Sequence, residues 1–236
     1  MTYLSRLTRL GSLAGLLIGA LVFAATASAG PSSRSLAPEN PGPAEAAGAH
    51  GAVAARVAFH DAMRVLWEDH IIWTRQYIVS AATLPGDLPD IGPTTERLLA
   101  NQTDIGNALK PFYGEAAGNQ VTALLRDHIL TAANLVAAAK AGDADAVEAT
   151  SAAWYQNADD IATALSGLNP RNWPLAHMKA HMRDHLDLTL EEAVARLEGR
   201  YADDIAAYDE VHIQILHMAD MLSDGIIVQF PHKFAR

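Results

Sequence analysis

From Val53 to the C-terminus, apolar residues recur every three or four positions, which is the spacing of one face of an α-helix. No segment shows the alternation of β-branched and polar residues that a half-buried strand requires. The pattern therefore predicts an all-α domain. Six helices are expected, at residues 53–83, 95–112, 116–141, 144–168, 174–198 and 204–230.

Helix-breaking residues separate these segments. Three prolines within 84–93 (LPGDLPDIGP) remove backbone donors and clash with the preceding helical turn. Gly142 followed by Asp143 predicts a helix C-terminus next to a helix N-cap, and Gly199 with Asp203 repeats this arrangement. The breaks therefore predict compact connections between consecutive helices.

A weak internal repeat relates the helices in pairs. Residues 101–109 (NQTDIGNAL) match residues 157–165 (NADDIATAL) at the Asn, Asp, Ile, Ala and Leu positions. An Asp-His pair precedes each of these segments, and a third Asp-His pair follows them. The histidines of the three pairs are His70, His128 and His185. The repeat predicts a bundle of three helical hairpins. Chance similarity between Ala- and Leu-rich helices is the alternative.

Each predicted helix directs one imidazole or amide side chain toward the interior. Because a buried polar group without a partner costs about one to a few kcal/mol, six of them at one level predict a hydrogen-bonded network, bound water or a metal ion. The six residues are His70, Asn101, His128, Asn157, His185 and His212. Among them, His70, Asn101, His128 and Asn157 are the candidates for holding a cofactor or small ligand. A layer that serves only to stabilise the fold is the alternative.

A second candidate site lies in the last two predicted helices. The segment HMKAHMRDH (177–185) places three histidines and two methionines at helical spacing, and more His and Met follow in 212–221. Imidazole and thioether ligands without thiolate are suited to copper. The predicted metal ligands are His181, Met182, His185, His212, His217 and Met218. Alternatively, the methionines simply pack in the core.

Composition narrows the classes of function. The chain has 17 basic and 27 acidic residues and a net charge of −10, which argues against nucleic acid as the main partner. It has no cysteine, which excludes disulfides, thiolate metal sites and thiol nucleophiles. Neighbouring acidic residues such as Asp203 and Asp204 are expected to be solvated. The favoured function is binding of a transition metal, copper first, by a non-enzymatic protein.

Two other functions remain open at this stage. One is an enzyme that uses His70, His128 and His185 as acid–base or metal-anchoring groups on a small substrate. The chain contains none of the sequence motifs HExxH, GxSxG or the phosphate-binding P-loop that would identify a reaction. The other is an interaction module that binds a partner through its helical surface.

The N-terminal residues 1–29 have the order of a secretory signal, with two arginines, an apolar run and an Ala-Ser-Ala sequence that ends at Ala29. Cleavage there predicts a periplasmic or secreted protein without a membrane-spanning helix. The Pro/Gly/Ala-rich residues 30–52 are expected to form a flexible linker. This leaves 53–236 as a single helical domain.

Five sequence segments in combination resemble a family of small bacterial helical proteins. The segments are LWEDHIIWTR (66–75), KPFYG (110–114), WYQNADDIA (154–162), HLDLTLEEAV (185–194) and QFPHKF (229–234). The resemblance extends over about residues 60–234. It implies no established activity, and the names glycosyltransferase and acetylglutamate kinase that some relatives carry have no supporting motif in this chain.

The resemblance also divides the candidate residues into two groups. It implies that Trp67, His70, His128, Asn157 and His185 belong to the shared pattern. His177, His181 and His217 do not belong to it. The resemblance therefore favours the interior polar layer as the functional feature of the family, with the surface His and Met residues as a departure in this chain.

Overall fold

The computed structural model describes residues 43–84 and 86–235. The predicted signal peptide and the predicted linker up to residue 42 lie outside the described residues. All regular elements in the described part are helical, which confirms the all-α prediction. They are α1 (Pro43–Ala81), α2 (Ile91–Ala141), α3 (Ala144–Leu168), α4 (Leu175–Leu197), α5 (Tyr201–Gln229) and the 3₁₀ helix η2 (Pro231–Phe234). Within these residues, none of the helices combines the length and apolar character needed to cross a membrane.

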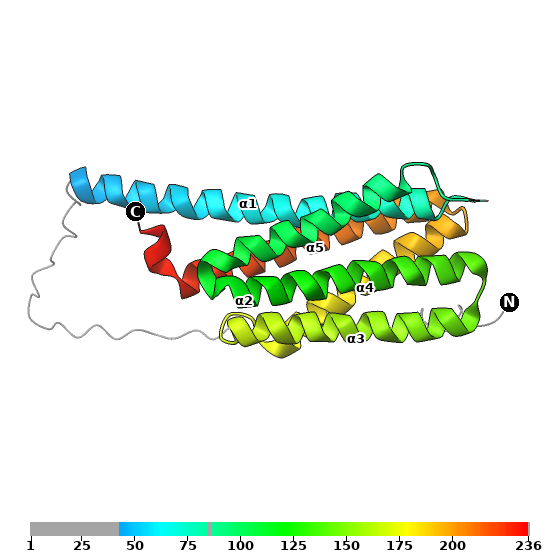
Figure 1. Ribbon diagram of the computed structural model, residues 1–236. Helices are drawn as coiled ribbons and strands as arrows, with labels where there is room; N and C mark the ends of the chain where they lie inside the picture. The colour runs from blue at the N-terminus through cyan, green and yellow to red at the C-terminus, as the bar shows by residue number, and fades with distance from the viewer. Residues whose placement is uncertain (1–42, 85, 236) are drawn as a thin grey trace, which may run out of the picture. The chain divides into compact units, whose positions relative to one another are not determined.

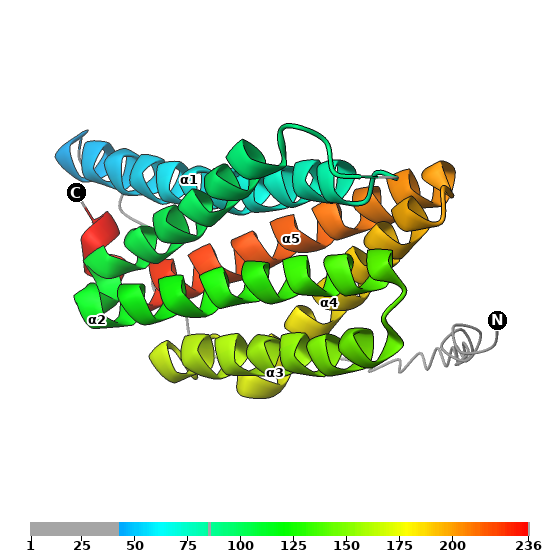
Figure 2. The ribbon, with the colours of Figure 1, turned by 45° about the vertical axis from the view of Figure 1, so that its right-hand side comes forward.

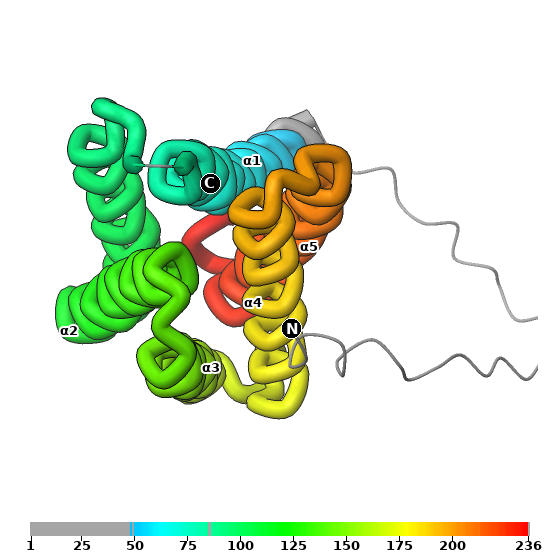
Figure 3. The backbone as a smooth tube through the Cα atoms, turned by 90° about the vertical axis from the view of Figure 1, so that its right-hand side faces the viewer, coloured from blue at the N-terminus to red at the C-terminus, as the bar shows by residue number. Residues whose placement is uncertain are grey.

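The helices of residues 43–235 pack side by side in chain order. Each helix contacts the next one, and α5 returns to pack against α1. Figure 1 and Figure 2 show α1, α2 and α3 running lengthwise along the molecule with α4 inclined to them, and Figure 3 shows the helices arranged around a shared interior. Every helix therefore contributes one face to the same core.

The structure has five α-helices where the sequence predicted six, because α2 includes two of the predicted segments. Gly114 interrupts α2 with φ 84° and ψ 169°, a conformation that is easily adopted only by glycine. Figure 2 shows that the chain reverses its direction at this point, so that the two parts of α2 lie side by side. Residues 91–113 and 115–141 are thus antiparallel parts of one helical element.

The predicted helix boundaries are accurate where a capping residue sets them. Gly142 has the left-handed φ of 70°, and Asp143 accepts a hydrogen bond from the backbone N of Ala146 at 3.0 Å, as predicted for a C-terminal glycine and an N-cap. Asp203, in contrast, lies inside α5, because this helix begins earlier, at Tyr201.

Helix α1 also begins earlier than predicted. Its first residue is Pro43, so that residues 43–52 of the predicted linker are helical. Proline is well tolerated at the first position of a helix, and the alanines that follow have the highest helix propensity of all residues. Local propensity therefore outweighs the Pro/Gly content that favoured a flexible linker.

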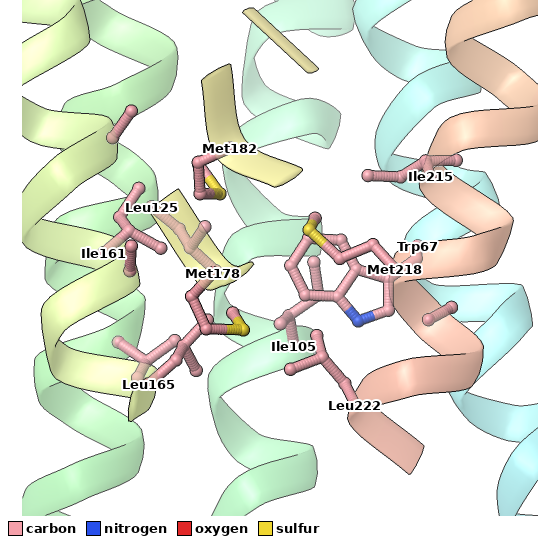
Figure 4. Packing of buried hydrophobic residues seen from close by; sticks show 14 of the residues in the cluster. Trp67, Ile105, Leu125, Ile161, Leu165, Met178, Met182, Ile215, Met218 and Leu222 are labelled. Carbon is pink, nitrogen blue, oxygen red and sulfur yellow. The ribbon is translucent and has the colours of Figure 1, made fainter. Parts of the chain in front are cut away.

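The core is apolar and draws on all five helices. Figure 4 shows side chains from each helix meeting between the backbones. Examples are Trp67 from α1, Ile105 and Leu125 from α2, Ile161 and Leu165 from α3, Met178 and Met182 from α4, and Ile215, Met218 and Leu222 from α5. Polar side chains placed in this interior need partners from neighbouring helices.

The two parts of α2 approach each other closely at Gly106 and Gly118. A Cβ atom on Gly106 would overlap Thr122 Oγ1 and lie 2.6 Å from the carbonyl oxygen of Gly118. We expect the G106A variant to lower the free energy of unfolding by about 1–3 kcal/mol, because the backbone must shift to relieve the overlap. Chemical denaturation measures this change.

The matched control is G167A in α3, where an added Cβ would meet nothing within 4 Å. This variant is expected to gain up to about 1 kcal/mol, since alanine has a higher helix propensity than glycine. Equal stability of G106A and the wild type would contradict the close packing of the two parts of α2.

Candidate histidine site

Three of the predicted site residues meet in the interior of the bundle. His70 of α1, His128 of α2 and His185 of α4 are only 2%, 3% and 3% exposed. The ring centroids of His70 and His185 are 5.6 Å apart, and those of His128 and His185 are 6.2 Å apart. We refer to His70, His128 and His185 as the histidine triad.

An amide side chain from a neighbouring segment supports each histidine of the triad. In all three cases its nitrogen donates a hydrogen bond to the carbonyl oxygen four residues before the histidine. The bonds run from Asn101 Nδ2 to Leu66 O (2.9 Å), from Asn157 Nδ2 to Leu124 O (3.1 Å) and from Gln214 Nε2 to His181 O (3.0 Å). Three equivalent bonds thus fix how three pairs of helical segments are aligned along their axes. This alignment brings the three imidazoles close together.

The tautomer of His128 follows from its contact with Asn157. Because Asn157 uses its nitrogen to donate to Leu124, its Oδ1 is left to accept a hydrogen bond from His128 Nδ1 at 2.9 Å. The His128 ring also stacks on Trp154, with centroids 5.3 Å apart and ring planes 29° apart. Nε2 of His128 is therefore the nitrogen that retains a lone pair.

Several nitrogen atoms around the triad are buried without a hydrogen bond in the described part of the chain. They are His70 Nδ1, His185 Nδ1, Trp67 Nε1 and Trp154 Nε1. Trp67 packs edge-on against His70, with centroids 5.9 Å apart. Because an unsatisfied buried polar atom costs about 1–3 kcal/mol, these nitrogens lower the stability of the bundle unless a partner reaches them.

The triad is uncharged at neutral pH. Burial, together with the nearby His128, lowers the pKa of His70 to about 3, and burial lowers the pKa of His128 to about 4. Burial also lowers the pKa of His185 well below its usual value, and His70 and His128 add to this effect. A neutral imidazole can bind a metal ion or accept a proton.

His212 lies outside this layer, contrary to the prediction. It is half-buried, its Nε2 is 3.0 Å from Glu68 Oε1, and its ring stacks on Tyr208. Gln214 supplies the interior amide of α5 in its place. The signal was present in the sequence, because Gln214 lies three residues after Val211 and four before Met218, which are both buried.

The remaining predicted metal ligands are spread over different environments. Met182 and Met218 are buried in the apolar core, and Figure 4 shows both turned inward between the helices. His181 and His217 line a surface hollow between α4 and α5. Within residues 43–84 and 86–235, no three His, Asp or Glu side chains are arranged to hold a metal ion as they stand.

A buried ion cluster lies further along the bundle and was not predicted. Arg75 of α1 donates hydrogen bonds to Glu192 Oε1 of α4 at 2.9 Å and to both carboxylate oxygens of Asp204 in α5. Both carboxylates are 0% exposed, so the expectation that Asp204 is solvated was wrong. Burial raises the pKa of Glu192 to about 7. The cluster therefore ties three helices together through one guanidinium group.

The chain matches no family model, no curated protein and no solved structure. What the site does must accordingly be inferred from the arrangement of its residues.

The low pKa of the triad histidines makes stability depend on pH. Because the unfolded chain binds protons at an imidazole pKa of 6.5 and folded His128 does so only at about 4, the unfolded state gains protons first as the pH falls. We expect the free energy of unfolding to decrease between pH 6.5 and pH 4, by about 3 kcal/mol from His128 alone. Urea denaturation at a series of pH values measures this.

The matched control is His128→Gln, which cannot titrate and whose curve should be flatter over the same pH range. Glu192 contributes in the opposite direction between pH 4.5 and about 7, but it does so in both proteins. Parallel curves for the two proteins would show that folded His128 titrates normally.

Proposed function

We propose that this protein binds one transition-metal ion at the histidine triad, with copper as the preferred metal. The observation that carries the proposal is the meeting of three uncharged imidazoles from three helices, with ring centroids 5.6 Å and 6.2 Å apart. A transition metal binds imidazole nitrogen at about 2.0–2.1 Å, so rotation of the side chains about χ1 and χ2 has to turn one nitrogen of each ring toward the ion.

The amide side chains supply the second layer of such a site. Asn157 orients His128 through Nδ1, as a hydrogen-bond acceptor behind a metal-ligating histidine does. The absence of cysteine leaves imidazole and thioether as the soft ligands, and Met182 lies one helical turn before His185. This ligand set favours copper over metals that prefer carboxylates.

We further infer that the site is built from three helical hairpins. Counting the two parts of α2 separately, the hairpins are α1 with residues 91–113, residues 115–141 with α3, and α4 with α5. Each contributes one triad histidine and one amide to the interior. The signal-like residues 1–29 support the proposal that the protein works outside the cytoplasm, as does the lack of thiols in the chain.

A purely structural polar layer is the second candidate function. The three recurring bonds from amide nitrogen to backbone carbonyl favour it, because they align the helical segments without any ligand.

Equilibrium dialysis of the full chain against Cu(II), reduced Cu(I) and Zn(II), followed by elemental analysis, tests the proposal. We expect one tightly bound copper ion per chain, which stays with the protein when free and weakly held metal is removed on a desalting column, and loss of this ion in the His185→Gln variant. The Asn157→Ala variant should keep the triad but bind about 10- to 100-fold more weakly, because His128 loses the group that orients it.

The control is His232→Ala, which removes an exposed histidine of η2 and should leave the stoichiometry at one. Circular dichroism establishes that each variant is folded. No copper uptake by the folded wild type at micromolar metal would overturn the metal proposal and favour the structural layer.

A further inference from the structure

A surface hollow lies between α4 and α5, on the outer side of the helix that carries His185. Four side chains that are able to bind metal ions line it, namely His181 and Asp184 from α4 and Glu210 and His217 from α5. Gln214 lines the same hollow. We refer to this feature as the α4–α5 hollow.

Gln214 connects the α4–α5 hollow to the histidine triad. Its Nε2 donates to His181 O at 3.0 Å, which holds the amide between α4 and α5. The acceptor of this bond lies one helical turn before His185 on α4. Gln214 Oε1 is buried and lacks a hydrogen bond in the described part of the chain. Gln214 thus lines the hollow and binds α4 at the turn that precedes His185.

The charge of the α4–α5 hollow favours a cation. Asp184 and Glu210 form no ion pair with any described residue, and no lysine or arginine lines the hollow. The neighbouring Arg183 is directed to Asp159, with its Nη2 atom 3.0 Å and 2.9 Å from the two carboxylate oxygens. Unneutralised carboxylates in a concave surface raise the local concentration of cations.

We propose that the α4–α5 hollow is the site where a transition-metal ion first binds, and that the ion passes from there beside Gln214 to His185. The imidazoles of His181 and His217 hold the ion, while Asp184 and Glu210 supply negative charge. First binding in the hollow stands on the lining residues alone, whereas transfer to His185 rests on the proposed function of the triad.

The transfer step is tested by the rate of metal loading. Trp67 and Trp154 contact the triad, so quenching of tryptophan fluorescence by Cu(II) in a stopped-flow experiment reports arrival of the ion. We expect the double variant H181A/H217A to load at least tenfold more slowly than the wild type and to reach the same stoichiometry. H177A removes an exposed histidine of α4 outside the hollow and is the matched control. An unchanged loading rate in the double variant would overturn the transfer step.

Binding in the hollow is tested separately in the double variant H70Q/H185Q, which lacks two of the three triad ligands. Added Cu(II) should selectively broaden the imidazole NMR signals of His181 and His217, and not the signal of His177. No broadening overturns the inference, whatever the triad binds. Broadening in this variant, together with a wild type that loads no metal at the triad, supports the hollow as a metal site and rejects the proposed function.

Discussion

Three uncharged imidazoles in an apolar interior are the constraint on which the rest of this structure depends. A charged imidazole at such a position would lose most of its hydration, so burial keeps all three rings neutral. Neutral rings still need polar partners, and those partners have to come from other helices. Asn157 Oδ1 meets this need for His128. The amide nitrogens of Asn101, Asn157 and Gln214 have a different role, because each binds a carbonyl one turn before a histidine and so fixes the position of that helix along its neighbour.

The second buried polar cluster is charged, in contrast to the uncharged triad. At a rise of about 1.5 Å per residue, Arg75 lies about 7.5 Å beyond His70 along α1, and Glu192 lies about 10 Å beyond His185 along α4. There, charges are buried and compensate one another across three helices. Removing one partner from such a cluster leaves an unpaired charge, whereas changing one triad residue leaves only an unpaired neutral group. The ion cluster is therefore suited to fixing the fold, whereas the triad tolerates substitution at a smaller electrostatic cost.

The sequence predicted the helical class, most helix ends and the three triad residues, because these depend on local periodicity and capping. Gln214 was not predicted in the polar layer, because the sequence pattern pointed to His212 as the interior polar residue of the last helix. Asp204 was missed for a different reason. Its position three residues before buried Ala207 places it on the buried face of α5, but its partner Arg75 comes from α1, and no local pattern in the sequence links the two. Pairings between distant helices are decided by packing of the whole bundle.

The predicted metal ligands lie in two different places, an inner group in the core and an outer group at the surface. His181 and His185 are one turn apart on α4, yet His181 reaches the surface hollow while His185 lies in the core. A site at the surface exchanges ions quickly, because its side chains are free to rotate and water has direct access. A site in the core exchanges slowly but selects its ligand, because its rings are held by packing and by amides. Gln214 lines the surface hollow and donates to His181 O one helical turn before His185, so it lies between the outer and the inner group.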